Sequence, residues 1–288
     1  MTGVDLHAHT TASDGSLTPT ELVNLALSVG LSALAVTDHD TLDGLQEAEE
    51  AARGTLLEIV PGIELAVEYT TGRFHMLGYF INCHSDVLHT RLRTLKENRA
   101  RRNERMVEKM VSLGLPITMD EIVAESGGGQ IGRPHMVAAL LKKGLVTSSA
   151  EAWARYLMDG AAAHVPKDKI GLQEGLDVIH AAGGLAVMAH PNSIKLDDRQ
   201  LAAELPRLHR LGLDGLECYY SQYPSERVET LIALARKAGL IPTGGSDFHG
   251  TPKPDVYLGR IYCGRPAPAE ILEAMEAALA QRAGAEHV

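Results

Sequence analysis

The sequence of 288 residues has few cysteines and no long hydrophobic run. Its three cysteines, Cys83, Cys218 and Cys263, lie far apart and form no Cys-x-x-Cys pair, which argues against a thiolate zinc site and a disulfide framework. No hydrophobic run approaches the roughly 20 residues that are needed to cross a bilayer. The first ten residues also lack the basic and apolar stretches of a signal peptide. We therefore expect a cytoplasmic protein without a membrane partner.

An excess of positive charge is also missing, because 27 lysines and arginines face 37 aspartates and glutamates and give a net charge of −10. Since a general nucleic-acid coat needs a basic surface, we expect no long duplex nucleic acid as a partner. A local basic site can still bind a nucleotide. With 45% hydrophobic residues, the chain is long enough to bury a full core, in one large domain or in one with a smaller insertion.

What the sequence does contain is histidine, with 13 residues, several of them beside aspartate at the ends of short hydrophobic runs. Such runs alternate with helical patterns, which predicts an α/β fold with a parallel sheet covered by helices. The first helix is expected to begin at Thr18-Pro19 with a capping box to Glu21 and to end at Gly30. Strands are expected at residues 4–7, 33–37, 56–60, 63–69, 75–81, 185–189, 215–219 and 240–243.

The alternation breaks between residues 87 and 167, where helical patterns follow one another without a clear strand. We expect helices at residues 88–113, 119–126, 134–143 and 150–158. The sequence thus predicts one domain built from residues 1–86 and 168–288, with an all-helical insertion at residues 87–167 that contributes substrate-binding residues.

Polar side chains recur where the predicted strands end. His7 and His9 are two positions apart in a strand, so both imidazoles can face one cavity. Glu64 lies in an otherwise hydrophobic strand, where a carboxylate is costly to bury unless it binds a cation or a partner. Taken singly, each such residue is more often a turn residue, a cap or a hydrogen-bonded core histidine. Their joint recurrence at strand ends is hard to explain in that way, and further candidates of this kind are Asp14, His39, His75, His190, Asp247 and His249.

A set of short motifs carries a family resemblance that runs from residue 5 to residue 250. The motifs are DLHAHT (5–10), SDG (13–15), TDHDT (37–41), GIE (62–64), His75, AHP (189–191) and SDFHG (246–250). In this order they make the chain resemble the PHP (polymerase and histidinol phosphatase) family of metal-dependent phosphoesterases. The resemblance implies a distorted seven-stranded (βα) barrel with an active centre of three divalent ions.

Carried over residue by residue, the resemblance also implies a ligand set. His7, His9, Glu64 and Asp247 would hold one ion, and Glu64 would bridge to a second ion held by His75 and His190. Asp14, His39 and His249 would hold the third. Six neutral imidazoles and three carboxylates carry a charge of −3, against +6 for three divalent ions, so the centre would attract a phosphate. Mixed nitrogen and oxygen donors favour Mn²⁺, with Fe²⁺ or Zn²⁺ as alternatives.

The chemistry expected of such a centre is hydrolysis with a metal-bound hydroxide as the nucleophile. Glu64 and Asp247 would act as ligands that hold this centre, and His39 or His249 would assist proton transfer to the leaving oxygen.

The insertion contains the candidate substrate-binding residues. Arg99 and Arg102 are neighbours on one face of an arginine-rich helix and could bind one anion, although a salt-bridged, solvated helix face is the plainer interpretation of that helix. Arg133 precedes a helix with proline in its first turn, so its side chain and the helix N-terminus could meet an anion together. His135 could add a hydrogen bond, and Lys167 is a weaker candidate.

Within the family, these features resemble the stand-alone enzymes that act on nucleotides. The expected reaction is hydrolysis of the 3′-phosphate of nucleoside 3′,5′-bisphosphates, and the main alternative is a 5′–3′ exoribonuclease on short RNA that uses the same centre. A histidinol-phosphate phosphatase and a non-catalytic PHP module are further alternatives. The expected partner is a small phosphorylated nucleotide or a short RNA, and the sequence leaves the oligomeric state open.

Overall fold

A computed structural model describes residues 3–127 and 130–285. Seven strands follow one another around one sheet in chain order. Backbone hydrogen bonds from Asp247 and Phe248 to the carbonyl of His7, at 2.8 and 3.3 Å, bring the last strand back beside the first. The sheet is therefore a nearly closed barrel, as the family resemblance implies. The strands are β1 (Val4–Ala8), β2 (Ala33–Val36), β3 (Glu58–Val67), β4 (Phe74–Tyr79), β5 (Leu185–Met188), β6 (Gly215–Tyr220) and β7 (Ile241–Gly245).

Two expectations about the sheet are wrong. The sheet is not wholly parallel, because β4 runs antiparallel to both β3 and β5. Only residues 68–73 join β3 to β4, and a parallel partner would need a crossover of a dozen or more residues. In addition, the expected strands at 56–60 and 63–69 are one strand, β3, which pairs with β2 up to Pro61 and with β4 from Gly62 onward.

Helices outside the barrel pack on its hydrophobic strands. The first, α1, begins after Thr18 with Pro19 in its first turn, closes a capping box with Glu21 and ends at Gly30, where φ is 77°. Each of these features is as the sequence predicts, and a φ in this range favours glycine. The helices around the barrel are α1 (Pro19–Val29), α2 (Leu45–Ala52), α7 (Leu172–Ala181), α8 (Asp198–Leu211), α9 (Ser225–Lys237) and α10 (Glu270–Ala285), with a short 3₁₀-helix at Pro191–Ile194.

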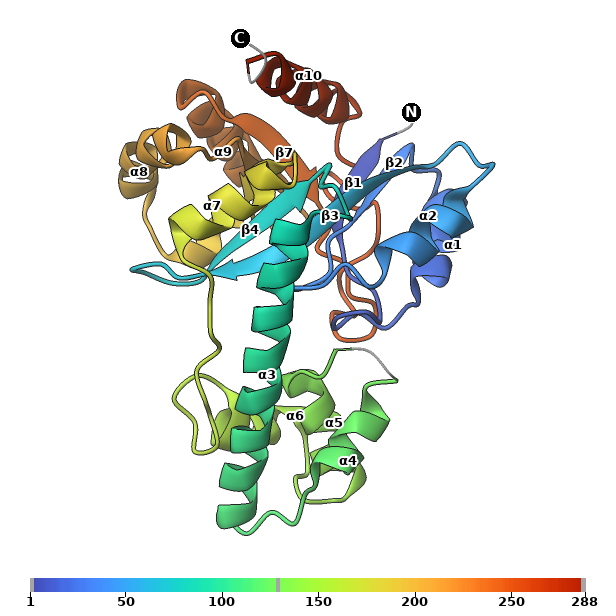
Figure 1. The fold of residues 1–288 in the computed structure, drawn as a ribbon, viewed down its shortest axis with the longest axis vertical. Helices are drawn as coiled ribbons and strands as arrows, with labels where there is room; N and C mark the ends of the chain where they lie inside the picture. The colour runs from blue at the N-terminus through green and yellow to red at the C-terminus, as the bar shows by residue number, and fades with distance from the viewer. Residues whose placement is uncertain (1–2, 128–129, 286–288) are drawn as a thin grey trace.

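The segment between β4 and α7 is helical and lies below the barrel in Figure 1, with the long helix α3 running from one to the other. It packs around a hydrophobic cluster of its own that includes Met106, Ile122, Met136 and Leu140. Its elements are α3 (Asp86–Ser112), α4 (Met119–Glu125), α5 (Arg133–Lys142), α6 (Ser149–Ala152) and a π-helical turn at Trp153–Leu157.

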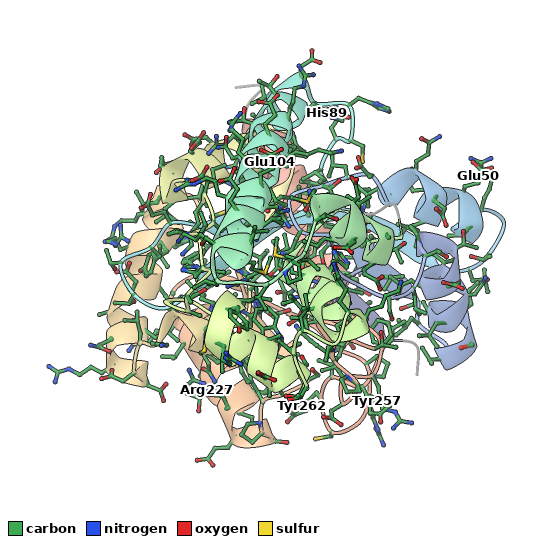
Figure 2. All side chains as sticks on the ribbon, turned by 90° about the horizontal axis from the view of Figure 1, so that it is seen from below. Glu50, His89, Glu104, Arg227, Tyr257 and Tyr262 are labelled. Atoms are coloured by element: carbon green, nitrogen blue, oxygen red, sulfur yellow. The ribbon has the colours of Figure 1, made fainter. Side chains whose placement is uncertain are left out.

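Many charged side chains lie on the outer surface. Figure 2, seen from below, labels Glu50 on α2 at the edge of the molecule and Glu104 on α3 within its outline, and both are exposed. Within the described part of the chain, no helix combines the length and hydrophobicity required of a membrane span.

Candidate metal centre

One end of the barrel collects all nine of the histidines and carboxylates that the sequence singles out as metal ligands. Parallel strands deliver most of them there at their C-terminal ends. The antiparallel strand β4 delivers His75 near its N-terminal end, which lies at the same edge of the sheet. The residues come from β1 and the loop after it (His7, His9, Asp14), from the loop after β2 (His39), from β3 (Glu64) and β4 (His75), and from the loops after β5 (His190) and β7 (Asp247, His249).

The first group of donor atoms lies around one carboxylate oxygen of Glu64, Oε2. Nε2 of His7 lies 3.5 Å from Glu64 Oε2 and 3.5 Å from Asp247 Oδ1. Nε2 of His9 lies 3.3 and 3.4 Å from the same two oxygens. Tetrahedral ligands about 2.1 Å from one ion are separated by about 3.4 Å, so the spacing fits a shared cation.

Buried atoms without partners support this fit. His7 Nε2, His9 Nε2, His39 Nδ1 and Glu64 Oε2 are all buried, and none of them has a hydrogen-bond partner among the residues that the structure describes. Leaving such polar atoms unsatisfied is costly, and cations bound in the groups to which these atoms belong would satisfy them. The donor set therefore fits divalent ions.

The second group surrounds the other oxygen of the same carboxylate. Glu64 Oε1 lies 2.8 Å from His75 Nδ1 and 3.1 Å from His190 Nε2. Glu64 is 1% exposed, so both of its oxygens face the centre and not the solvent. One carboxylate thus faces two separate groups of imidazoles, which is the geometry that a bridging ligand needs.

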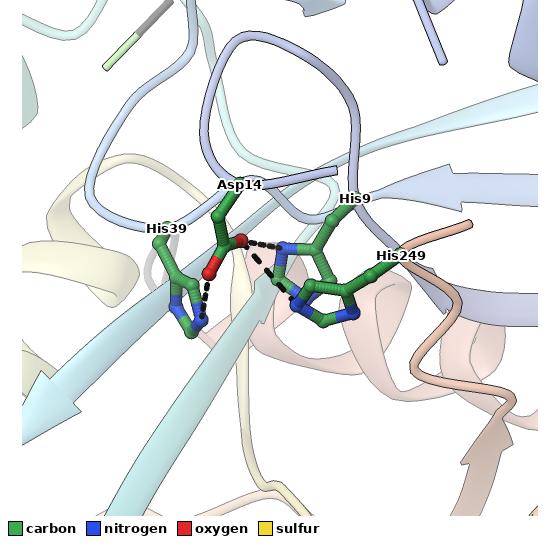
Figure 3. Close-up of side chains that lie close together, drawn as sticks. All are labelled: His9, Asp14, His39 and His249. Atoms are coloured by element: carbon green, nitrogen blue, oxygen red, sulfur yellow. Dashed lines mark ion pairs between the residues drawn. The ribbon is translucent and has the colours of Figure 1, made fainter. Parts of the chain in front are cut away.

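The third group is shown in Figure 3, where Asp14 lies among three imidazoles. Asp14 Oδ1 is 3.3 Å from His249 Nε2 and 3.8 Å from His9 Nδ1, and Asp14 Oδ2 is 4.0 Å from His39 Nε2. The other ring nitrogen of His39, Nδ1, lies 3.0 Å from Glu64 Oε2. His39 therefore contacts two of the groups, whereas the family resemblance gives it to the third group alone.

Charges within the cluster shift the pKa values of its members in the metal-free protein. Burial by itself would raise the pKa of Glu64, but the imidazoles of His39, His75 and His7 hold this pKa well below its ordinary value. Burial would lower the pKa of His7, but the carboxylates of Glu217, Asp247 and Glu64 raise that pKa well above its ordinary value. Burial lowers the pKa of His75 to about 4. The carboxylates are thus ionised at neutral pH, as metal ligands must be.

Several residues beside the centre were not named as site residues from the sequence. Asp38 accepts hydrogen bonds from the backbone N–H of Thr10 at 2.8 Å and from the hydroxyl of Ser13 at 2.5 Å, and so fixes the loop that carries Asp14. Lys253 lies 2.6 Å from Asp247 Oδ2. A second buried glutamate, Glu217, contacts His7. The signal that identified Glu64, a glutamate within a hydrophobic strand, is also present at Glu217 in GLECY.

A cavity of about 670 Å³ opens from the centre toward the helical segment. This volume is within the range of about 300–1,000 Å³ that is usual for small-molecule sites. Its walls include Asp14, His39, Glu64, His75, His190, Asp247 and His249 from the centre and the cationic residues Arg73, Arg99, Arg102, Arg133, Lys167 and Lys253.

The arginines that the sequence proposes for substrate binding differ in their surroundings. Arg99 forms an ion pair with Asp40, whose carboxylate also lies 2.7 Å from Lys167. Arg133 donates to the carbonyl of Leu157 at 3.1 Å and to Asp159 at 2.8 Å. Arg99 thus already has a carboxylate partner, and its joint anion site with Arg102 stays a prediction.

Arg102 is the exception among these arginines. It is 8% exposed, its Nε has no hydrogen-bond partner, and no carboxylate of the described residues lies within ion-pair distance of it. Burial and the charges of Arg99 and Arg133 lower its pKa to about 10. It remains a cation at neutral pH, and it borders the cavity.

His135, which the sequence proposes as a source of a hydrogen bond to the substrate, contacts the backbone at the start of its own helix, and its role in substrate binding stays a prediction. His135 Nδ1 accepts a hydrogen bond from the backbone N–H of Gly132 at 3.0 Å and so caps the start of α5. Among the described residues the cavity lining includes Gly132, Arg133 and Pro134 but not His135. The reason is local, because the third residue of a helix is well placed to bond back to the residue before its first turn.

The sequence and the fold of this chain are similar to those of several known enzymes. The PHP domain family matches residues 5–99. The chain is 34% identical over 261 residues to the 5′-3′ exoribonuclease Rnm of Escherichia coli K12, which covers 89% of this chain and 88% of that protein. It is 28% identical to the 3′,5′-nucleoside bisphosphate phosphatase of Chromobacterium violaceum, with 86% and 88% covered. A solved structure from Bifidobacterium adolescentis, described as a metal-dependent phosphoesterase, superimposes with a TM-score of 0.82, 33% identity and 95% of both chains covered.

The barrel and the relatives define the class of this protein, a metal-dependent hydrolase of phosphoric esters. The chain belongs to the PHP family.

Proposed function

We propose that the protein hydrolyses the 3′-phosphate of nucleoside 3′,5′-bisphosphates at this centre. The observation that carries the proposal is a single cavity with two chemically different ends. One end is the cluster of histidines and carboxylates, and the other contains Arg102, a buried cation without a carboxylate partner among the described residues. A substrate with two phosphates would use both ends.

The nine side chains would hold three divalent ions, with Mn²⁺ as the preferred metal and Fe²⁺ or Zn²⁺ as alternatives. Ions held there would supply an activated water molecule and positive charge for the oxygens of the reacting phosphate. Glu64 and Asp247 would act as catalytic residues by holding these ions with their carboxylates. Both His39 and His249 border the cavity, where one of them assists proton transfer to the leaving oxygen.

The phosphate that is not cleaved is held in the helical segment, residues 87–167, which we propose is a substrate-binding insertion. Arg102 is the principal contact because a charge-assisted hydrogen bond to phosphate would satisfy its unpartnered guanidinium. Arg73, from the loop between β3 and β4, borders the same cavity and adds a second cation. Arg99 and Arg133 contribute more weakly because each is already paired with a carboxylate. His135 supports the loop that presents Arg133.

A second candidate function is 5′–3′ exonuclease activity on short RNA, and the 34% identity to the exoribonuclease Rnm favours it. The two activities share one geometry. In each, the 5′-phosphate of a nucleotide is held at the arginines, and the bond between phosphorus and the 3′-oxygen of that nucleotide is hydrolysed. They differ in whether the reacting phosphate carries a further nucleotide.

The test is phosphate and nucleotide release with Mn²⁺ across matched substrates. The panel contains a nucleoside 3′,5′-bisphosphate, the corresponding 3′- and 5′-monophosphates, a 5′-phosphorylated trinucleotide, the same trinucleotide without the 5′-phosphate, and histidinol phosphate. We expect the highest kcat/KM for the bisphosphate. Faster turnover of the 5′-phosphorylated trinucleotide would make the exonuclease the main activity, and a preference for histidinol phosphate would refute the nucleotide proposal.

A further inference from the structure

Glu217 on β6 is a fully buried carboxylate that contacts two candidate metal ligands at once. Its side chain is 0% exposed. Oε1 lies 2.8 Å from Nδ1 of His7, and Oε2 accepts a hydrogen bond from the backbone N–H of His190 at 2.6 Å. His7 lies on β1 and His190 follows β5, so one carboxylate on β6 connects two different parts of the centre.

Burial of this carboxylate calls for compensation. An ionised carboxylate without water is strongly disfavoured unless it is paired. Among the described residues, the only ionisable group within ion-pair distance of Glu217 is His7, and no lysine or arginine reaches it. A cation-binding centre on the far side of the His7 ring would explain why a carboxylate occupies this buried position.

The contact with His7 fixes which ring nitrogen faces the centre. With the Nδ1 proton donated to Glu217, the lone pair of Nε2 points the other way, toward Glu64 Oε2 and Asp247 Oδ1 at 3.5 Å each. Histidines that bind metals usually donate their second ring N–H to a carboxylate or carbonyl, which fixes the tautomer and raises the basicity of the ligand.

The contact with His190 acts on the backbone. His190 has a φ of 27°, which a non-glycine residue rarely adopts. The hydrogen bond from its N–H to Glu217 helps to hold this conformation, and in it the ring places Nε2 3.1 Å from Glu64 Oε1. His7 and His190 belong to the two groups that share Glu64, so Glu217 supports both sides of the bridge.

We propose that Glu217 is a positioning residue of the metal centre, which orients the imidazole of His7 and the backbone of His190 so that both rings face Glu64. This inference rests on the proposed function only for the statement that the centre binds metal, and it does not depend on which substrate is hydrolysed.

A matched control exists at the opposite end of β5 and β6. Asp214 Oδ2 lies 3.0 Å from Nε2 of His180 and accepts a hydrogen bond from the backbone N–H of Ala186 at 2.8 Å. Asp214 thus makes the same two kinds of contact as Glu217, and it also pairs with Arg282, but none of these partners is a candidate ligand. Asp214→Asn removes a carboxylate–histidine pair without touching the centre.

The experiment compares wild type, Glu217→Gln and Asp214→Asn after chelation and dialysis. Mn²⁺ affinity and stoichiometry are measured by titration, and the absorption spectrum of the Co²⁺-substituted protein reports the coordination. In Glu217→Gln an NH₂ group replaces one of the two carboxylate oxygens. This group is a hydrogen-bond donor and would face either the Nδ1–H of His7 or the backbone N–H of His190, so one of the two hydrogen bonds is lost. We therefore expect a loss of Mn²⁺ affinity of about 10- to 100-fold and a changed Co²⁺ spectrum, with Asp214→Asn within about threefold of wild type.

Wild-type affinity and an unchanged Co²⁺ spectrum in Glu217→Gln would overturn the inference, and so would an equal loss of affinity in Asp214→Asn. If Glu217→Gln does not fold, Glu217→Asp replaces it, because it keeps the charge but withdraws the carboxylate by one methylene, and the same outcomes decide. Absence of metal binding by the wild-type protein would instead defeat the metal centre and the proposed function together.

Discussion

Replacement of Arg102 by methionine separates substrate binding from the fold. The guanidinium of Arg102 is 8% exposed and lacks a carboxylate partner among the described residues, so its charge has a cost in the folded protein. That cost is also the reason why its pKa is lowered to about 10. Methionine has a similar length and no charge. We expect Arg102→Met to unfold at the same temperature as wild type or higher.

The catalytic effect should have the opposite sign. A charge-assisted contact with phosphate contributes about 1.5–3 kcal/mol, which corresponds to a loss of about 10- to 150-fold in kcat/KM. The loss should appear for a nucleoside 3′,5′-bisphosphate and should be small for an aryl phosphate, which has no second phosphate. Arg133→Met is the matched control, because Arg133 borders the same cavity but is paired with Asp159 at 2.8 Å. We expect its loss on the bisphosphate to be smaller than about tenfold.

The assay is steady-state phosphate release with Mn²⁺ on both substrates, together with thermal melting of each variant. Equal losses on the bisphosphate and on the aryl phosphate would show that Arg102 supports the centre and does not bind the second phosphate. A melting temperature several degrees below that of wild type would show that the charge of Arg102 stabilises the fold. It would refute the claim that this buried charge, without a carboxylate partner, has a cost in the folded protein.

Three further predictions concern the centre itself. Glu64→Gln should reduce the rate of phosphate release by about a hundredfold or more, because a neutral amide cannot replace a carboxylate between two cations. Activity within tenfold of wild type, in a variant with an unchanged melting temperature, would refute the bridging role. Removal of metal should lower the melting temperature by several degrees, because metal that binds only the folded state stabilises it. An unchanged melting temperature after verified removal of the metal would exclude a shared, buried centre. Mn²⁺ affinity should rise with pH above the ordinary histidine pKa of about 6.5, because the carboxylates of Glu217, Asp247 and Glu64 outweigh burial and raise the pKa of His7, so that metal must displace a proton. In the metal-free protein this raised pKa contributes stability that is complete below the ordinary histidine pKa of about 6.5 and is lost as the pH rises through the folded value. Calorimetric titration in buffers of different ionisation enthalpy measures the proton release, and an affinity that is independent of pH would contradict it.

The sequence by itself determined the class of fold and pointed to the residues of the centre. Hydrophobic runs of strand length that alternate with helical patterns predicted an α/β fold with a sheet covered by helices, and the family resemblance implied that this sheet is a barrel. Local signals predicted α1 from its cap at Thr18 to Gly30. The candidate ligands could be named because histidine and carboxylate are costly in hydrophobic strands, as at Glu64, and because such residues recur at strand ends. These are local properties, since each depends on a few neighbours along the chain.

What only the tertiary structure decided depends on contacts between residues far apart in sequence. The pairing of β4 with β5, which lies beyond the whole helical segment in the chain, is one such contact. Arginine-rich composition could not tell Arg99 from Arg102, because the ion pair with Asp40 joins positions 59 residues apart. Glu217 meets His7 across 210 residues. Whether a charged side chain is paired, and which ring nitrogen faces a centre, is fixed by packing, and the sequence contains no local signal for it.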